Sequence, residues 1–398
     1  MARIAIFCDG TWNSPTMKQP THVVRLFNKT IKSNAQQAHY FEGVGVDTKD
    51  PGIVRRTIMK VGGGAFGWGL NDHIKAAYKA LVQQYQPDDE IFVFGFSRGA
   101  YTARSLVGMI RKCGMIEDAT DANVDAAFEL YRKPGVANHP DALHILQERR
   151  RLSPRTATSR DDINWRKVHP WEGHPTEFHK VTIRYLGVWD TVGSLGVPAP
   201  ILGNIANFLN RKYHFHDTSL TSMVQAARHA VALDERRVLY QPTLWDNLEA
   251  TRDHPGLNKG DRSEERPYQQ IWFIGTHAIV GGSEAKARAL TGDPLDWIAR
   301  GAKDAGLDID MSNLLDRAPD PLVDSFALSN PPWLYKVVGH MLKWRAGPGH
   351  PIDLAPSADI RVKKRRDYRP RSLKNLMPEL FGAEPLPKPV RVNDGPQR

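Results

Sequence analysis

Short continuous runs of apolar residues recur along the first three hundred positions of the chain, and the clearest of them end at a glycine or an aspartate. These runs cover residues 4–8, 91–94, 181–189 and 271–274, and a weaker one covers residues 39–46. Runs of this length without polar alternation are typical of strands that are buried on both faces of a sheet. The pattern therefore predicts a sheet whose two faces are covered.

Segments with helical periodicity lie between these runs. Residues 71–85 place apolar side chains three or four positions apart, and residues 98–113 predict a helix that directly follows a strand. Two further helices are predicted at residues 220–233 and 294–305. Strand, tight turn, helix and strand in succession indicate an α/β fold, with a mostly parallel sheet and helices on both of its faces.

The alternation of strands and helices is interrupted twice, which indicates insertions into one large domain. The first interruption covers about residues 115–180, with helical segments followed by an irregular polar stretch at 153–175, and the second covers residues 198–216. We expect residues 1–330 to form the main domain, including both insertions. We expect residues 331–398 to form a C-terminal extension whose basic tail is partly disordered.

Composition narrows the range of partners and cofactors. The 398 residues include 54 Lys and Arg against 44 Asp and Glu, a net charge of +10, and residues 361–398 hold eleven basic against four acidic residues. This tail is expected either to contact an anionic membrane surface peripherally or to be solvated, and no nucleic-acid partner is predicted because aromatic residues are not interleaved with the basic ones. Cys8 and Cys113 are too few for a disulfide framework or a thiolate zinc site. We expect no metal and no cofactor.

The sequence also bears on localisation. No stretch approaches the roughly 18 consecutive apolar residues of a membrane-spanning helix. The apolar run at the N-terminus reaches Asp9 too early to form the core of a signal peptide. We therefore expect a cytoplasmic protein, with delivery by a specialised secretion system that reads no N-terminal signal as the alternative.

The sequence Gly-Phe-Ser-Arg-Gly at residues 95–99 fits the pattern G-x-S-x-G. It lies directly between a predicted strand and a predicted helix, as does the sharp turn that presents a nucleophilic serine. Gly95 and Gly99 suit this turn because a side chain at either position would collide with neighbouring elements. Ser97 is therefore the candidate nucleophile, and the N–H of Arg98 is the expected first donor to an oxyanion. The competing interpretation is an ordinary N-cap serine.

A serine hydroxyl needs a base, and the base needs an acid that orients it. Folds with this turn place the three groups in the chain order serine, acid, histidine, near the carboxyl ends of strands. Asp190 directly follows the run at 181–189, and His277 follows the run at 271–274. Both are candidate catalytic residues. The competing interpretations are a turn-capping aspartate and an ordinary loop histidine.

Asp9, Gly10 and Thr11 close the first predicted strand and are expected at the same edge of the sheet. The N–H groups of Gly10 and Thr11 are candidates for the second oxyanion donor. Asp9 is expected to support this loop by accepting backbone hydrogen bonds, and the alternative is that it binds a cation.

Five blocks of the sequence resemble, in order, the signature blocks of one α/β-hydrolase family. This is the domain of unknown function 2235, which includes the catalytic domains of one class of type VI secretion phospholipase effectors. The resemblance spans about residues 3–305 and implies an α/β-hydrolase fold with serine esterase chemistry. It departs from the family pattern after His277, at Ala278, Ile279 and Ser283. The blocks are FCDGTWN (7–13), FGFSRGAYTAR (94–104), GVWDTVG (187–193), ARHAVALDERR (227–237) and WFIGTH (272–277).

The residues and the resemblance together predict a serine hydrolase that cleaves carboxylic esters, with a lipase or phospholipase as the more specific expectation. The alternatives are an esterase or thioesterase acting on a small soluble substrate, and an inactive binding protein with a hydrolase fold. The apolar segments at 198–209 and 332–344 are too short to span a membrane. Each is expected to be core, and the alternatives are a lid or an interfacial anchor.

Overall fold

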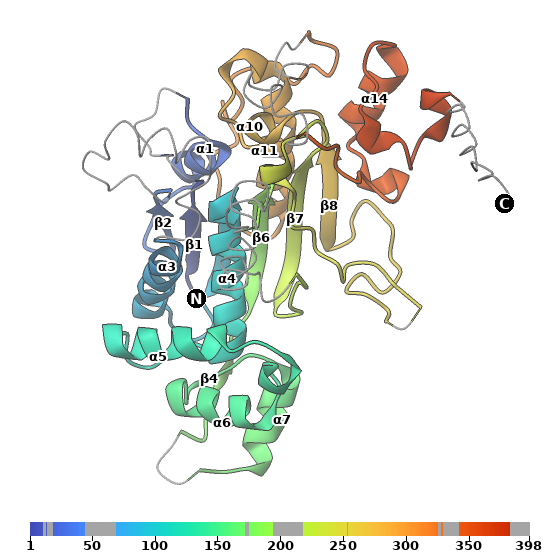
Figure 1. Ribbon diagram of the computed structural model, residues 1–398. Coiled ribbons are helices and arrows are strands. Elements are labelled where there is room, and N and C mark those ends of the chain that lie inside the picture. Colours follow the sequence, from blue (N-terminus) through green and yellow to red (C-terminus); the bar gives the residue numbers. More distant parts are fainter. Residues whose placement is uncertain are drawn as a thin grey trace, which may run out of the picture.

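The computed structural model describes residues 1–10, 13, 19–43, 69–171, 175–193, 218–252, 254–324, 328 and 342–382. At its centre lies a six-stranded sheet in which every neighbouring pair of strands is parallel (Figure 1). The strands, in spatial order, are β2 (Gln36–Phe41), β1 (Arg3–Cys8), β3 (Glu90–Phe96), β6 (Ile183–Trp189), β7 (Val224–Ala232) and β8 (Tyr268–Phe273).

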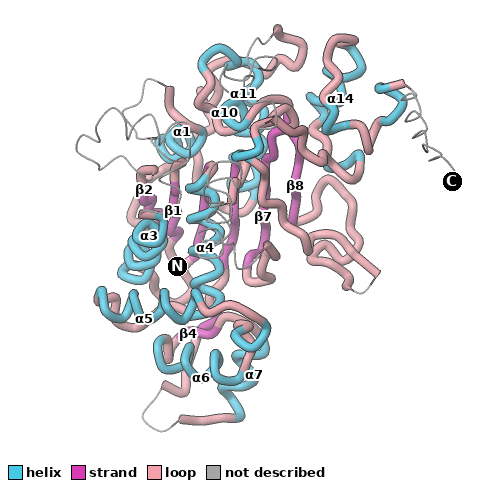
Figure 2. The backbone as a smooth tube through the Cα atoms, viewed as in Figure 1, coloured by secondary structure: helices cyan, strands magenta, loops and turns pink. Residues whose placement is uncertain are grey.

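Helices cover both faces of this sheet (Figure 2). Successive side chains of a strand point to opposite faces, so in β1 Ile4 and Ile6 enter one core while Ala5 and Phe7 enter the other. The continuous apolar runs follow from this arrangement, and the predicted α/β fold class is confirmed. The covering helices are α3 (Leu70–Gln84) and α4 (Arg98–Cys113) on the first face, and α1 (His22–Lys29) and α11 (Arg288–Asp304) on the second.

The prediction of a helix at residues 220–233 is wrong, because most of this segment forms strand β7. Its alanine, glutamine and arginine residues favour a helix when they are considered alone. In the fold, however, β7 lies between β6 and β8, and Ala230 and Val231 are fully buried under the covering helices. Tertiary packing therefore overrides local propensity, since small side chains fit well between two covered neighbouring strands.

The carboxyl ends of the strands form the upper edge of the sheet in Figure 1. β1 lies between β2 and β3, so the chain leaves β1 toward one side and later returns on the other. Open parallel sheets bind ligands outside the strand ends near such a reversal. Gly10 follows β1, Ser97 follows β3, Asp190 follows β6 and His277 comes shortly after β8.

The first insertion lies beyond the opposite edge, below the sheet in Figure 1. Helix α7 occupies part of the stretch at 153–175, so the expectation of irregular structure there is wrong. Ser159 caps this helix by accepting a hydrogen bond from the Asp162 N–H, and the buried Asp162 carboxylate pairs with Arg149 (3.3 Å) and Arg166 (2.8 Å). The insertion contains α5 (Asp121–Arg132), α6 (Leu143–Leu152), β4 (Thr156–Ala157), α7 (Arg160–Val168) and β5 (His179–Lys180).

Residues 342–382 pack beside β8 (Figure 1). Leu354 forms a parallel bridge with Trp272 of β8, and the Tyr368 hydroxyl bonds to the carboxylate of Asp234 just beyond β7. Helix α14 (Pro356–Lys364) contains the start of the basic stretch, where Arg361 is buried and donates to backbone carbonyls. This segment is therefore joined to the second core of the sheet.

The described chain also contains several short helices. None of the described helices combines the length and the apolar character needed to cross a membrane. The segment at 198–216 and most of the segment at 332–344 lie outside the described residues. The short helices are η1 (Val136–Asn138), η2 (Val238–Tyr240), α10 (His277–Val280), η3 (Ala285–Ala287), η5 (Pro351–Asp353), η6 (Arg371–Leu373) and η7 (Pro378–Phe381).

Candidate active site

Ser97 lies in a sharp turn between β3 and α4. β3 ends at Phe96 and α4 begins at Arg98, so one residue makes the whole connection. Ser97 has φ 58° and ψ −122°, a conformation that L-residues rarely adopt, and its N–H still donates to the Trp189 carbonyl of the neighbouring strand (3.0 Å). The turn therefore keeps the sheet intact while it turns the serine toward the carboxyl edge.

The two glycines that flank Ser97 are required by close backbone packing. A Cβ atom at Gly95 would lie 2.4 Å from the Gly99 carbonyl oxygen, and one at Gly99 would lie 2.2 Å from the Cys8 carbonyl oxygen. Both distances are far inside van der Waals contact with backbone atoms that cannot move aside. The collision predicted from the sequence is therefore present at both positions, and it ties β1 to the beginning of α4.

A chain of hydrogen bonds joins three side chains from three strand ends. His277 Nε2 lies 2.8 Å from Ser97 Oγ, and His277 Nδ1 lies 2.6 Å from Asp190 Oδ2. Ser97 and His277 are 180 positions apart in the sequence, so they meet because strands β3 and β8 end at the same edge of the parallel sheet. All three residues are buried, with 8% of Ser97 exposed, 6% of His277 and none of Asp190.

His277 is held both at its backbone and at its ring. Its backbone N–H, at the start of α10, donates to Glu235 Oε2 (3.2 Å). Its ring contacts the rings of Phe96 and Tyr240, whose centroids are 4.7 and 4.8 Å away. Gly281 allows this packing, because a Cβ there would come within 2.1 Å of the Phe96 ring. The ring is thus fixed in the plane that joins Ser97 to Asp190.

Asp190 sits in a second unusual turn, with φ 41°, directly after β6. Its Oδ1 accepts a hydrogen bond from the Ala232 N–H (2.8 Å). Its carboxylate also accepts two hydrogen bonds from Arg345, from Nη1 to Oδ1 (2.6 Å) and from Nη2 to Oδ2 (2.9 Å). Arg345 could not be predicted as part of the site from the sequence, because it belongs to no motif and follows no predicted strand.

Burial and charge together set the protonation of the pair formed by His277 and Asp190. Burial alone raises the pKa of Asp190, but Arg345 and His277 outweigh it and hold that pKa well below its usual range. Burial lowers the pKa of His277, and the Asp190 carboxylate opposes that effect without cancelling it. At neutral pH the aspartate is therefore charged and the imidazole neutral. Nδ1 then donates to Asp190, which leaves Nε2 to accept from the Ser97 hydroxyl.

His229 supports the turn at Asp190 from the neighbouring strand. Its Nε2 accepts a hydrogen bond from the Thr191 N–H (3.1 Å), and its Nδ1 lies 3.0 Å from Gln270 Oε1. Burial lowers the pKa of His229 to about 3, so this ring stays neutral with Nδ1 as the donor. Because β7 is a strand and not a helix, His229 pairs with Val188 of β6, two residues before Asp190.

The three candidate oxyanion donors, Arg98, Gly10 and Thr11, differ in what the structure shows of their backbone N–H groups. Arg98 is the first residue of α4, where backbone N–H groups point out of the helix end beside Ser97. Gly10 lies against Ser97, since a Cβ at Gly10 would be 3.2 Å from Ser97 Cβ, but its N–H donates to Asp9 Oδ1 (2.6 Å). Thr11 lies outside the described residues.

Asp9 joins the loop after β1 to two neighbouring elements. Its Oδ2 accepts hydrogen bonds from Thr21 Oγ1 and Tyr40 Oη, both at 2.7 Å, in addition to the bond from Gly10 to Oδ1. Burial raises the pKa of Asp9, and these hydrogen bonds oppose that effect only in part. Its observed contacts are therefore those of a loop support. Among the residues that the structure describes, no three His, Cys, Asp or Glu side chains are grouped to hold a metal ion.

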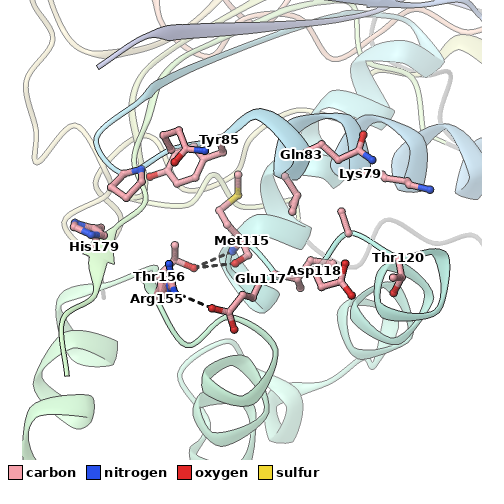
Figure 3. A pocket seen from close by; sticks show the side chains of 15 residues that line it. Lys79, Gln83, Tyr85, Met115, Glu117, Asp118, Thr120, Arg155, Thr156 and His179 are labelled. Carbon is pink, nitrogen blue, oxygen red and sulfur yellow. Dashed lines mark hydrogen bonds and ion pairs between the residues drawn. The ribbon is translucent and has the colours of Figure 1, made fainter. Parts of the chain in front are cut away.

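A separate pocket lies at the opposite edge of the sheet, where the connection before β3 meets the end of α4 (Figure 3). Its lysine and its arginine are paired, Lys79 with Asp121 of the neighbouring helix α5 (2.7 Å) and Arg155 with Glu117 (3.0 Å), and Asp118 also lines it. Its walls include Tyr85 and Met115. The pocket is thus separated from Ser97 by the length of a strand, and its lysine and arginine already have acidic partners.

Comparison with known proteins identifies the family. A family model described as T6SS, phospholipase effector Tle1-like, catalytic domain matches residues 2–301. The chain belongs to this family. The membership confirms the resemblance drawn from the five sequence blocks. Arg345 lies beyond the matched residues, so the Tle1-like match itself does not include it.

Individual relatives are distant, and the chain spans only part of each. An uncharacterized protein of Saccharomyces cerevisiae is 29% identical over 241 residues, which are 58% of this chain and 31% of that protein. An uncharacterized protein from Pseudomonas aeruginosa of known crystal structure has a TM-score of 0.41 and 16% identity, over 78% of this chain and 47% of that one. The structure of the Tle1 effector bound to the VgrG spike from the type VI secretion system has a TM-score of 0.37 and 16% identity, over 74% of this chain and 52% of that one.

Proposed function

We propose that the protein is a serine hydrolase that cleaves carboxylic ester bonds in lipids. Ser97 is the nucleophile, His277 the general base and then the general acid, and Asp190 the residue that orients the imidazole. The observation that carries the proposal is the unbroken hydrogen-bonded chain, 2.8 Å from Ser97 Oγ to His277 Nε2 and 2.6 Å from His277 Nδ1 to Asp190 Oδ2. The protonation state expected at neutral pH is the one that this chemistry needs.

The reaction proceeds in two half-reactions. Ser97 Oγ attacks the ester carbonyl carbon while its proton passes to His277 Nε2. The tetrahedral intermediate then collapses, and His277 returns the proton to the departing alcohol. Water, deprotonated by His277, next attacks the acyl-enzyme, and the acid is released with Ser97 restored. Asp190 stays ionised throughout and stabilises the imidazolium that forms in each half-reaction.

The oxyanion of each intermediate needs donors beside Ser97. We assign the N–H of Arg98 as the first donor, since it follows the nucleophile at the start of α4, where the helix dipole favours negative charge. Gly10 and Thr11 remain the candidates for the second donor. For Gly10 this role requires its N–H to turn from the Asp9 carboxylate toward the substrate.

The assignment of a phospholipid substrate is supported by membership of the Tle1-like phospholipase effector family. The net charge of +10 favours approach to an anionic membrane surface, where such a substrate is concentrated. Delivery of the protein by a type VI secretion system fits the same membership.

The test of this proposal is covalent labelling followed by turnover. A fluorophosphonate should label the wild-type chain at Ser97, and Ser97→Ala should abolish both labelling and ester hydrolysis. Ser105→Ala, a small change two turns further along α4, is the matched control and should retain both. A folded wild-type chain that takes no label would indicate an inactive binding protein instead.

Substrate class is tested separately. We expect higher rates on anionic phospholipid vesicles than on short p-nitrophenyl esters at equal ester concentration. With a short-chain phospholipid, we expect the rate to rise above the concentration at which that lipid aggregates. A protein that hydrolyses the soluble esters and leaves vesicles untouched would be an esterase or thioesterase for a small substrate.

A further inference from the structure

Arg345 makes an unusual set of contacts for a side chain outside the family-matched region. The residue is 2% exposed, and its guanidinium faces four acceptors. Nη1 donates to Asp190 Oδ1 (2.6 Å) and to the Ala232 carbonyl (2.8 Å), while Nη2 donates to Asp190 Oδ2 (2.9 Å) and to the Tyr240 carbonyl. One residue of the C-terminal segment thus bonds to both oxygens of Asp190 and to two segments near His277.

Each carboxylate oxygen of Asp190 binds one nitrogen of Arg345 and one further donor, and that further donor differs between the two oxygens. Oδ1 receives Arg345 Nη1 and the Ala232 N–H, so it is fully engaged on the side away from His277. Oδ2 receives Arg345 Nη2 and His277 Nδ1. Rotation of the carboxylate about its last bond would break the paired bonds to the planar guanidinium. Oδ2 is therefore kept aimed at the imidazole.

We propose that Arg345 is a positioning residue for catalysis, which holds the Asp190 carboxylate ionised and oriented so that His277 presents Nε2 to Ser97. The inference rests on the proposed function and extends it, because it makes residues 342–382 a part of the active site. The same guanidinium also binds the Tyr240 carbonyl, and the Tyr240 ring packs on His277. Arg345 therefore fixes the imidazole by two routes, through the carboxylate and through the packed ring.

The charge of Arg345 has a consequence that its packing alone would not have. His277 and Asp190 share a hydrogen bond, so they titrate as a coupled pair, and a cation beside them lowers the proton affinity of the pair wherever the proton resides. Among the described residues, Glu235 and Arg237 are the other charged groups that act on His277, and they are bonded to each other at 2.7 Å. The adjoining His229 ring is neutral near pH 7. Loss of Arg345 is therefore expected to raise the apparent pKa of the pair.

Two substitutions separate these roles. Arg345→Met keeps a long side chain without the charge or the donors, and Arg345→Lys keeps the charge without the planar pair of nitrogens that fixes the orientation of the carboxylate. We expect Arg345→Met to lower kcat/KM for a short p-nitrophenyl ester at least about tenfold and to move the acid limb of its pH profile upward by about one unit. We expect Arg345→Lys to lower kcat with little change in KM and to leave the acid limb near its wild-type position.

The outcomes separate this inference from the proposed function. Failure of the wild-type chain to react with a fluorophosphonate at Ser97 would remove the proposed function itself. A reactive wild-type chain together with a folded Arg345→Met variant of unchanged rate and pH profile would overturn only the role of Arg345. If Arg345→Met does not fold, as judged by thermal melting, Arg345→Lys decides, because wild-type kcat in that variant contradicts the positioning role.

Discussion

The backbone of Ser97 holds a conformation that its neighbours impose. A residue at φ 58° is stable there only because β3 ends and α4 begins on either side of it, with Gly95 and Gly99 packed against backbone. The signal for this turn was present in the sequence, since two glycines around a serine, after an apolar run and before a helix, satisfy the same steric requirement. This part of the candidate site was predictable because its determinants are local.

Gly99→Ala should therefore destabilise the fold as well as the site. The added methyl group would lie 2.2 Å from the Cys8 carbonyl oxygen, so β1 and α4 must separate, and we expect a loss of about 3 kcal/mol in the free energy of unfolding. Thermal melting measures the effect. Gly349→Ala is the matched control, because a Cβ there meets nothing within 4 Å, and its melting temperature should stay near that of the wild type. Equal melting temperatures for the two variants would contradict the packing argument.

The pH dependence of hydrolysis should follow the buried imidazole. The base must be neutral to accept the serine proton, and burial lowers the pKa of His277 from the usual value of 6.5. We therefore expect kcat/KM to rise with pH through an apparent pKa below 6.5 and to be level at pH 7. Initial rates on a soluble ester between pH 4 and 8 provide the measurement. An acid limb centred above pH 7 would show that His277 is not held neutral in this way.

Among the secondary-structure elements, β7 marks the limit of what the sequence could reveal. The predicted helix at about residues 98–113 matches the bounds of α4, because its periodicity and its boundary residues agree with the packing that the fold gives it. β7 was predicted as a helix because its alanines carry no periodicity of their own, and only pairing with β6 and β8 makes the segment extended. A sheet partner is a non-local property, so a reading of local propensity fails there.

The strand assignment gives His229 a role that a helix would not. On β7 its ring accepts from the Thr191 N–H and bonds to Gln270, so His229→Leu leaves a buried N–H without an acceptor. We expect a loss of about 2 kcal/mol in unfolding free energy and slower fluorophosphonate labelling. Urea denaturation and labelling kinetics measure the two effects. Gln225→Leu, at an exposed position of the same strand, should change stability by less than about 0.5 kcal/mol. If His229→Leu changes neither the unfolding free energy nor the labelling rate, the turn at Asp190 needs no support from β7.

At the level of the whole molecule, the contact between Arg345 and Asp190 joins positions 155 residues apart. A single arginine in an irregular segment carries no spacing or motif that marks it, so one sequence alone offers no way to find it. Its role becomes visible only after the fold places residues 342–382 beside β8. The candidate catalytic residues could be proposed from strand ends, whereas the contact with Arg345 depends on how a late segment returns to the sheet.

A chain that stops before residue 342 should therefore lose the site as well as part of the core. It would lack the guanidinium that pairs with Asp190, and it would expose the surface now covered by Leu354, Val362 and Tyr368. A buried carboxylate without its cation is costly, so we expect either an insoluble product or a soluble one that a fluorophosphonate labels at least about tenfold more slowly. A chain that ends at Gly382 keeps every contact described above and serves as the control, with labelling at the wild-type rate. Normal labelling of the shorter chain would instead show that the family-matched region forms a complete active site alone, with Asp190 held by Ala232 and His277.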